Sequence, residues 1–192
     1  MELKDILNSG EMYNDLSEDC IKARNYATKL TKEYNESTDQ EERKIILNKL
    51  LNKCGENSHF EPNFRCEYGF NISIGDNFFA NFDCIILDCA PVNIGNNVLF
   101  GPRVGIYCAN HAIDPIERQN GGCYSKAVNI GNNVWIGAGV HIVQGVNIGD
   151  NSVIGAGSVV LSDIPPNVVA AGNPCKVIRE ITENDKTGYI KL

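Results

Sequence analysis

The sequence contains no uninterrupted apolar run of the roughly 18 residues that a transmembrane helix requires. Its first residues, Met1–Asp5, also lack the apolar core of a signal peptide. A membrane protein is therefore not expected, and we predict a cytoplasmic location.

The sequence is also short of positive charge and of metal-binding patterns. It has 17 basic and 24 acidic residues, a net charge of -7, which argues against a nucleic-acid or anionic membrane partner. There is no Cys-x-x-Cys pair, and none of the three histidines stands at metal-ligand spacing from a pair of cysteines. We therefore expect the eight cysteines to be reduced and mostly buried, and we expect no metal site.

What the sequence does contain is a six-residue repeat of aliphatic residues, most often followed by glycine. The hexamer Asn-Ile-Gly-Asn-Asn-Val occurs twice, at 93–98 and 129–134. A period of six does not match a helix and is too long for the alternation of a simple strand. It indicates a parallel β-helix, in which three hexads form one triangular turn of about 18 residues. The repeat is regular from Ile130, with upstream copies at Ile94, Phe100 and Ile106 and a looser start at Ile74.

We assign residues 56–165 to this solenoid, with an inserted loop at about 112–128 and a C-terminal cap at 166–192. The six-residue frame is lost after Ile106 and resumes at Ile130. An insertion of this kind forms a loop on one face of a solenoid, which is often the face that binds ligands.

Residues 1–55 differ in composition, because they are charged, contain little glycine and have a helical pattern. One helix is predicted at about 17–35, with Ser17 as N-cap. A second begins at Thr38, where Thr38–Glu41 has the capping-box form. We expect the apolar faces of both helices to pack on the first turn of the solenoid. The predicted apolar positions are Ala23, Tyr26, Ala27, Leu30, Tyr34, Ile45, Ile46, Leu50 and Leu51.

His111 is the leading candidate for chemistry, because it stands at the only insertion and a histidine exchanges protons near neutral pH. No Gly-x-Ser-x-Gly elbow and no Walker loop is present. A general base without a protein nucleophile favours direct transfer, in which the deprotonated acceptor attacks the donor. His59 and His141 have no such setting. A structural or merely exposed role for His111 is the competing interpretation.

The hexads, the loop with His111, the segment Val134–Gly137 and the ending Asp163–Glu180 together resemble the hexapeptide acyltransferases. The helical N-terminus narrows the resemblance to the maltose and galactoside O-acetyltransferase branch, over about residues 8–185. This resemblance implies a mainly β fold, a left-handed parallel β-helix with a small N-terminal helical appendage. It also implies a homotrimer that binds acetyl-CoA between adjacent subunits and transfers the acetyl group to a sugar hydroxyl.

The resemblance implies roles for individual residues as well. His111 would be the general base, and the backbone N–H of Ala138 would stabilise the oxyanion. The residues that match acceptor contacts are Asp15, Arg24, Glu67, Asn81 and Asp88. Those that match coenzyme A contacts are Trp135, Ala138, Ala156, Ser162, Lys176 and Arg179, of which the two cations suit the phosphates. The sequence departs from the family pattern on the acceptor side, at Phe79, Cys89, Asn110 and Ala112.

Several alternatives stay open at this point. Asn81 can be a corner residue, Asp15 a helix cap, and Lys176 and Arg179 members of an exposed terminal strand. The enzyme can instead acetylate an amine or an antibiotic hydroxyl, as xenobiotic acetyltransferases of the same fold do, or the solenoid can be a scaffold without activity. A metal-dependent hydratase of solenoid fold is set aside, because it needs three zinc histidines in a different spacing.

Overall fold

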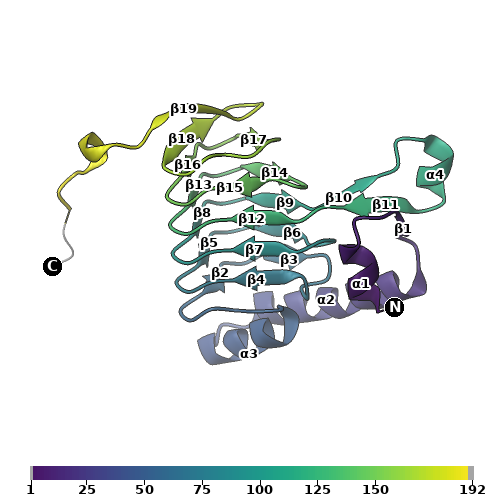
Figure 1. Cartoon of the computed structure of the whole chain (residues 1–192). Coiled ribbons are helices and arrows are strands. Elements are labelled where there is room, and N and C mark those ends of the chain that lie inside the picture. The colour runs from purple at the N-terminus through teal and green to yellow at the C-terminus, as the bar shows by residue number, and fades with distance from the viewer. Residues whose placement is uncertain (1, 190–192) are drawn as a thin grey trace.

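Short strands alternate with tight corners through most of the chain and stack into the three sides of a prism (Figure 1). The computed structural model describes residues 2–189. Face 1 contains β2 (His59–Phe60), β5 (Phe79–Ala80), β8 (Leu99–Phe100), β13 (Trp135–Ile136), β16 (Val153–Ile154), β18 (Val168–Ala171) and β19 (Lys176–Glu180). Face 2 contains β3 (Arg65–Cys66), β6 (Ile85–Leu87), β9 (Gly105–Tyr107), β14 (His141–Val143) and β17 (Val159–Val160). Face 3 contains β4 (Ile72–Ile74), β7 (Val92–Ile94), β12 (Val128–Ile130) and β15 (Asn147–Ile148).

The aliphatic residue of each hexad points into the prism, where it stacks on its equivalent in the next turn. Ile94 pairs with Ile130, and Ile130 pairs with Ile148, all three being buried. Val134 and Ser152, at the second inward position, are buried too. The predicted mainly β solenoid and the stacking of Ile130 on Ile148 are therefore confirmed.

The predicted turn of 18 residues holds only in the later part of the solenoid. Equivalent corner residues are 18 residues apart from Asn133 to Asn151, but 20 apart from Asn77 to Asn97. The two additional residues lie at the corner between face 2 and face 3. The inward aliphatic residues on either side of this longer corner stay buried, but they stand eight residues apart, as from Ile86 to Ile94, where a regular hexad has six.

A column of asparagines turns the chain at the corner between face 3 and face 1. Each of them has a positive φ, between 55° and 61°, a conformation that asparagine tolerates better than most residues. Each side-chain amide also hydrogen-bonds to the next one in the column; the distance from Nδ2 of Asn133 to Oδ1 of Asn151 is 2.9 Å. The column consists of Asn57, Asn77, Asn97, Asn133, Asn151 and Asn167.

The helices α2 (Glu18–Glu36) and α3 (Gln40–Leu50) cover the first turn of the prism (Figure 1). Tyr34 donates a hydrogen bond from Oη to the main-chain oxygen of Phe60 at 2.6 Å and accepts one from its N–H at 3.0 Å. Asn35 binds both main-chain groups of Phe64 in the same way, at 2.9 Å each. These two side chains take the place of a neighbouring strand.

The predicted Ser17 N-cap is confirmed, because its side chain accepts a hydrogen bond from the N–H of Cys20. The capping box at Thr38 is wrong, since Asp39 caps α3 by accepting from the N–H of Glu42. Tyr26 and Ile45 are also more than half exposed, so both helices turn a slightly different face to the core than predicted. No helix within residues 2–189 is long and apolar enough to cross a membrane.

An arm leaves the prism between face 2 and face 3. It consists of β10 (Ala109–His111), the short helix α4 (Pro115–Gln119) and β11 (Gly122–Ser125). Its base closes where the N–H of Lys126 bonds to the oxygen of Cys108 at 2.9 Å. The predicted insertion at about 112–128 is thus centred about three residues too late. β1 (Tyr13–Asn14), which follows the N-terminal helix α1 (Leu3–Asn8), pairs with β11 and joins the N-terminal segment to the arm.

The C-terminal segment first continues the stack and then turns back on it. β18 pairs in parallel with β16, so the regular stack extends into the residues expected to form the cap. β19 then pairs antiparallel with β18 and is exposed along its whole length. A single 3-10 turn, η1 (Glu183–Asp185), follows.

Candidate active site

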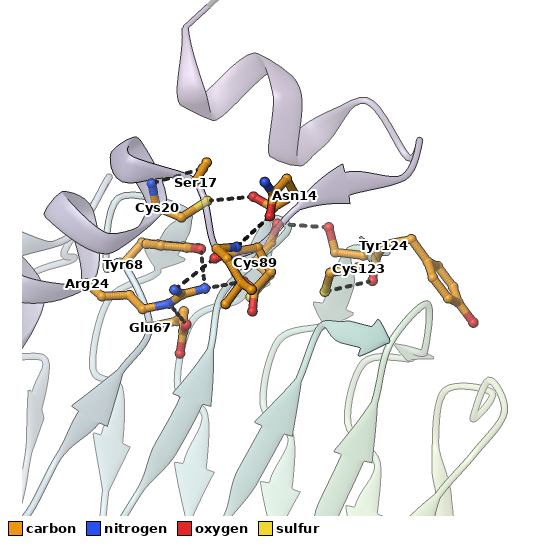
Figure 2. Close-up of polar contacts among 12 residues, drawn as sticks. Asn14, Ser17, Cys20, Arg24, Glu67, Tyr68, Cys89, Cys123 and Tyr124 are labelled. Atoms are coloured by element: carbon orange, nitrogen blue, oxygen red, sulfur yellow. Dashed lines mark hydrogen bonds and ion pairs between the residues drawn. The ribbon is translucent and has the colours of Figure 1, made fainter. Parts of the chain in front are cut away.

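Arg24 on α2 is the centre of an ionic cluster at the corner between face 2 and face 3 (Figure 2). Its guanidinium pairs with the carboxylates of Asp15 and Glu67 and donates to the main-chain oxygen of Asp15 at 3.0 Å. Tyr68 Oη lies 3.3 Å from Nη2. Burial lowers the pKa of Arg24, but the hydrogen bond to Glu67 and the nearby charges outweigh it and leave the pKa above its usual value. Two carboxylates around one guanidinium leave the cluster with one negative charge in excess.

Asp88 lies directly beneath this corner. Its side chain is fully buried, and its carboxylate accepts hydrogen bonds from the main-chain N–H groups of Glu67, Tyr68 and Asn71. Burial raises the pKa of Asp88, and these N–H donors work against the rise. The carboxylate therefore faces the main chain of the corner and not its outer surface.

The arm places His111 in line with two residues of this region. In the three-stranded sheet, His111 lies opposite Cys123, and Cys123 lies opposite Tyr13. Directly opposed residues of antiparallel strands project their side chains to the same side of the sheet. His111, which is exposed, therefore shares a side of the arm with Cys123 and Tyr13, which are buried against the prism.

Tyr13, Cys89 and Cys123 belong to a small apolar cluster. Cys89 and Cys123 lie near Arg24 in Figure 2. The hydroxyl of Tyr13 is buried beside the thiols of Cys89 and Cys123, without a well-formed hydrogen bond among the described residues. Burial raises the pKa of the Tyr13 hydroxyl and of the Cys89 thiol. No group of three or more His, Cys, Asp or Glu side chains within residues 2–189 is arranged to hold a metal ion. Because burial raises these pKa values, the side chains of this apolar cluster are uncharged, next to the ionic cluster of Arg24.

Asn81 stands at a different corner, between face 1 and face 2, immediately after β5. Its side chain is partly exposed, and its Oδ1 accepts the N–H of Phe82 at 2.8 Å. The Nδ2 donors of Asn81 make no hydrogen bond within residues 2–189. Phe79, two residues earlier, packs edge-on against His59. Asn81 thus fits both the corner role and a role as a donor to a ligand.

Ala138 and Ala156 occupy equivalent positions further up the same corner. Both are exposed, and the N–H of neither donates a hydrogen bond within the described part of the chain. Gly137 allows this stacking, because a Cβ there would lie 2.6 Å from the Ala156 nitrogen. The corner therefore presents free main-chain N–H groups to a ligand.

Trp135 lies on the outer surface of face 1, directly opposite Leu99. The two side chains are 55% and 49% exposed, although both are large and apolar. They continue a row of outward residues in which Phe79 precedes Leu99, and Val153 and Val169 follow Trp135. Exposed apolar rows are typical of interaction surfaces.

The remaining candidate residues lie near the C-terminal end. Lys176 and Arg179 are exposed on β19, and Ser162 is exposed at the corner after β17. Arg179 forms a two-pronged ion pair with Asp185, with distances of 2.8 Å from Nη1 to Oδ2 and 2.7 Å from Nη2 to Oδ1. In this chain the guanidinium that resembles a phosphate ligand is already held by a carboxylate.

The structure therefore divides the predicted site residues into two sets. Those expected to bind the acceptor, with the exception of Asn81, lie with the arm at the corner between face 2 and face 3. Those expected to bind coenzyme A lie on face 1, at the corner between face 1 and face 2, or on β19, except Ser162, which lies at the corner between face 2 and face 3 in the last turn. Asp15, Arg24 and Glu67 are in direct contact, but one chain does not bring His111 and Ala138 to the same corner.

Tyr13 and Tyr68 were not predicted from the sequence, although both contact the candidate acceptor region. A faint signal was available for Tyr68, because it lies in a lengthened corner, which places Ile74 eight residues after Cys66, whereas Ile148 follows Ile142 by six. Tyr107 and His141 form a further unpredicted pair on face 2, with 3.0 Å between Oη and Nδ1.

Comparisons with known proteins agree with this architecture. Residues 127–162 match the model described as bacterial transferase hexapeptide (six repeats), and residues 7–55 match that of the maltose acetyltransferase hexapeptide capping motif. The galactoside O-acetyltransferase of Escherichia coli K12 is 46% identical over 193 residues, which cover 100% of this chain and 95% of that protein.

Two solved structures are similar to the whole fold. A maltose O-acetyltransferase from Clostridium difficile 630 has a TM-score of 0.91 and 50% identity, with 95% of this chain and 99% of that chain covered. A galactoside acetyltransferase in complex with coenzyme A has a TM-score of 0.92 and 46% identity, with 100% and 96% covered.

Proposed function

The chain belongs to the hexapeptide-repeat acetyltransferases that carry the maltose acetyltransferase capping motif, and from this we propose that it transfers the acetyl group of acetyl-CoA to a hydroxyl of a sugar. His111 is the general base of this reaction. Asp15, Arg24 and Glu67 bind the sugar, with Asn81 completing the acceptor site.

The observation that carries the proposal is the row formed by His111, Cys123 and Tyr13 across the arm. It places an exposed imidazole on the side of the arm that packs beside the ionic cluster of Arg24. Carboxylates accept hydrogen bonds from sugar hydroxyls and a guanidinium donates them. A sugar held there presents a hydroxyl toward His111.

The chemistry needs one proton transfer and one displacement. His111 takes the proton of the sugar hydroxyl while its oxygen attacks the thioester carbonyl carbon, a contribution of about 10²–10⁴ in rate. The carbonyl oxygen gains negative charge, which the N–H of Ala138 stabilises because that N–H donates to no acceptor among residues 2–189. The C–S bond then breaks, and coenzyme A leaves as its thiol with the proton from His111.

Coenzyme A follows the corner between face 1 and face 2 toward the C-terminal end. The free N–H of Ala156 continues the donor row of that corner for the pantetheine amides, which Trp135 flanks. Lys176 and Arg179 bind the phosphates, with Ser162 as a polar neighbour.

We infer a homotrimer, because the two sets of site residues lie at different corners of one prism. A neighbouring subunit that covers the outer side of face 1 would bring its arm to the donor corner and bury Leu99 and Trp135. Face 3 stays in water, since its outward row is Asn93, Asn129 and Asn147, whose amides hydrogen-bond to one another. Each active site then combines His111 of one subunit with Ala138 of the partner subunit.

A sugar acceptor is favoured over a xenobiotic or an amine by the N-terminal residues. The capping-motif match at 7–55 contains Asp15 and Arg24, two of the proposed sugar ligands. A cytoplasmic location accompanies the proposal, because all eight cysteines are free in the structure and thiols stay reduced in that compartment.

The proposal is tested by thiol release from acetyl-CoA with a panel of mono- and disaccharides. Mass spectrometry should show one sugar product heavier by one acetyl group, with the release of thiol in equal amount. An amine or antibiotic panel that is acetylated in preference to every sugar would contradict the proposal, and so would an absence of turnover with all acceptors.

A further inference from the structure

Asp88 is buried in the corner between face 2 and face 3, where it contacts main chain on both sides. Oδ1 accepts hydrogen bonds from the N–H of Glu67 at 3.1 Å and of Tyr68 at 2.8 Å, and Oδ2 accepts from the N–H of Asn71 at 3.2 Å. Asn71 also donates a hydrogen bond from its Nδ2 to the main-chain oxygen of Asp88, at 3.0 Å. The turn from Glu67 to Asn71 is thus held at both ends by one residue of the next coil.

Burial of a carboxylate to hold a turn costs free energy. The carboxylate loses its hydration, and no positively charged group contacts the Asp88 oxygens within the described residues. Its gain is geometric, because a carboxylate accepts several N–H groups at once and fixes their directions. At other corners the carboxylates that accept a main-chain N–H, such as those of Asp76 and Asp150, are exposed.

The turn that Asp88 holds is the one that faces Arg24. Glu67 pairs with the guanidinium, and Tyr68 Oη lies 3.3 Å from Nη2. Arg24 in turn pairs with Asp15. A continuous series of contacts therefore runs from Asp88, which is fully buried, to Asp15 at the proposed acceptor site.

We propose that Asp88 is a positioning residue for the acceptor, which orients Glu67 and Tyr68 through their main chain and does not itself contact the sugar. The inference rests on the proposed function, because it gives that acceptor site its support. A direct role would require the carboxylate to reach the surface, whereas its oxygens are occupied by three N–H groups of the corner itself.

The test is Asp88→Asn, which keeps the size of the side chain but turns one acceptor into a donor that faces an N–H group. The KM for the sugar should rise by about 10-fold or more, because displacement of ligands by less than 1 Å weakens binding and alignment. The KM for acetyl-CoA should stay within two-fold of the wild-type value. An equal rise in both KM values would mean a general loss of structure and would overturn the inference.

Asp76→Asn is the matched control. Asp76 also accepts a main-chain N–H of the adjacent coil, that of Glu56 at 2.8 Å, but at the corner between face 3 and face 1. Asn96 performs the same task one turn later, so an amide fits this position. Both KM values should remain unchanged in this variant.

A double-substitution cycle separates positioning from direct contact. If Asp88 acts through Glu67, the combination of Asp88→Asn with Glu67→Gln should lose little more than the worse single variant. Full additivity of the two losses would show that Asp88 acts on the acceptor by another route, contrary to the proposal.

Hydrogen exchange gives a readout that does not depend on activity. The amide protons of Tyr68 and Asn71 should lose protection in Asp88→Asn, and unchanged protection would overturn the inference. If that variant does not fold, Asn71→Ser loosens the same turn and should raise the sugar KM by a smaller factor. A wild-type protein that acetylates no sugar would instead remove the proposed function, while the exchange result would still report on the turn.

Discussion

His111 lies directly opposite Cys123 in the β10–β11 pair of the arm, and Cys123 is buried against the prism while His111 is exposed. The pairing therefore keeps His111 on the side of the arm that faces the candidate acceptor region, because the buried Cys123 fixes the orientation of the sheet.

Replacement of His111 by alanine should lower kcat by about 10²–10⁴, the usual value of a general base. The KM for acetyl-CoA should change little, because the residues proposed to bind it lie away from the arm. Steady-state kinetics by thiol release measure both quantities. His59→Gln is the control. His59 lies on the first turn beside Glu61, so this substitution should leave kcat and both KM values unchanged. A His111→Ala enzyme with full activity would exclude this residue as the base.

A charge on face 1 should break the assembly. Leu99→Asp places a carboxylate on an outward side chain that is 49% exposed in a single chain, so the fold of one chain should tolerate it. Sedimentation should show monomers in place of the proposed trimers, with loss of activity, because each proposed site combines residues of two subunits. Asn93→Asp on face 3 should leave the trimer intact; dissociation of this control would place the interface elsewhere.

The ion pair between Arg179 and Asp185 should compete with coenzyme A for the guanidinium. Asp185→Asn should lower the KM for acetyl-CoA by about two- to five-fold, in line with the modest strength of exposed pairs. Glu183→Gln is the matched control, since the Glu183 carboxylate pairs with Lys186 and not with Arg179. A higher KM in Asp185→Asn would mean that the pair supports the binding of coenzyme A.

This competition should not depend on pH in the usual assay range. The hydrogen bond from Arg179 holds the pKa of Asp185 at about 2, below its ordinary value of 3.8. A depressed pKa means that the contact is fully present above 3.8 and is lost as the pH falls through about 2. The KM ratio of wild type to Asp185→Asn should therefore be constant from pH 6 to about pH 9.

The asparagine column should contribute to stability through conformation as well as hydrogen bonding. Asn133 has a φ of 57° and bonds to Asn97 and Asn151. Asn133→Ala should cost about 2–3 kcal/mol, from a Cβ in the left-handed region and the lost bonds. Asn133→Gly should cost only about 1 kcal/mol, because glycine accepts this φ. Urea unfolding at one fixed subunit concentration measures the difference, and equal losses would contradict the conformational contribution.

Most of the thiols should react slowly with thiol reagents in the native protein. Burial raises the pKa of Cys108 to about 12, and six of the eight cysteines are buried. Ellman's reagent at pH 8 should therefore react with few of them until the protein is unfolded, when all eight should react. Rapid reaction of most thiols would show that the turns open easily. The expected low background also favours thiol release as an assay.

The fold was largely predictable, because one inward aliphatic residue in every six leaves few other structures. Ile130 stacks on Ile148 as the period requires. The lengthened turns were not predicted, although Ile94 follows Ile86 by eight residues and not six, because the aliphatic residues on both sides of the corner still point inward. The helix phases at Tyr26 and Ile45 were missed because contacts with the first turn decide which face is buried.

The candidate site was predictable in part. The resemblance identified Asp15, Arg24 and Glu67, which the fold does bring into contact. It did not reveal the place of Tyr13, because β1 has two residues and pairs with a strand far along the chain. Pairing between distant segments depends on the folded prism, and no local pattern marks it.

The side chains of Tyr34 and Asn35, which bind the main chain of Phe60 and Phe64, have a consequence for the behaviour of the protein at high concentration. A stack of parallel strands ends in unpaired main-chain groups, which other chains can extend into fibres. At the opposite end of the stack, the edge strand is β19, in which three of five residues are charged. Charged edge strands disfavour pairing with other chains. A chain without α2 would expose the main-chain groups of its first turn for pairing with other chains. We expect such a chain to aggregate more readily than it unfolds.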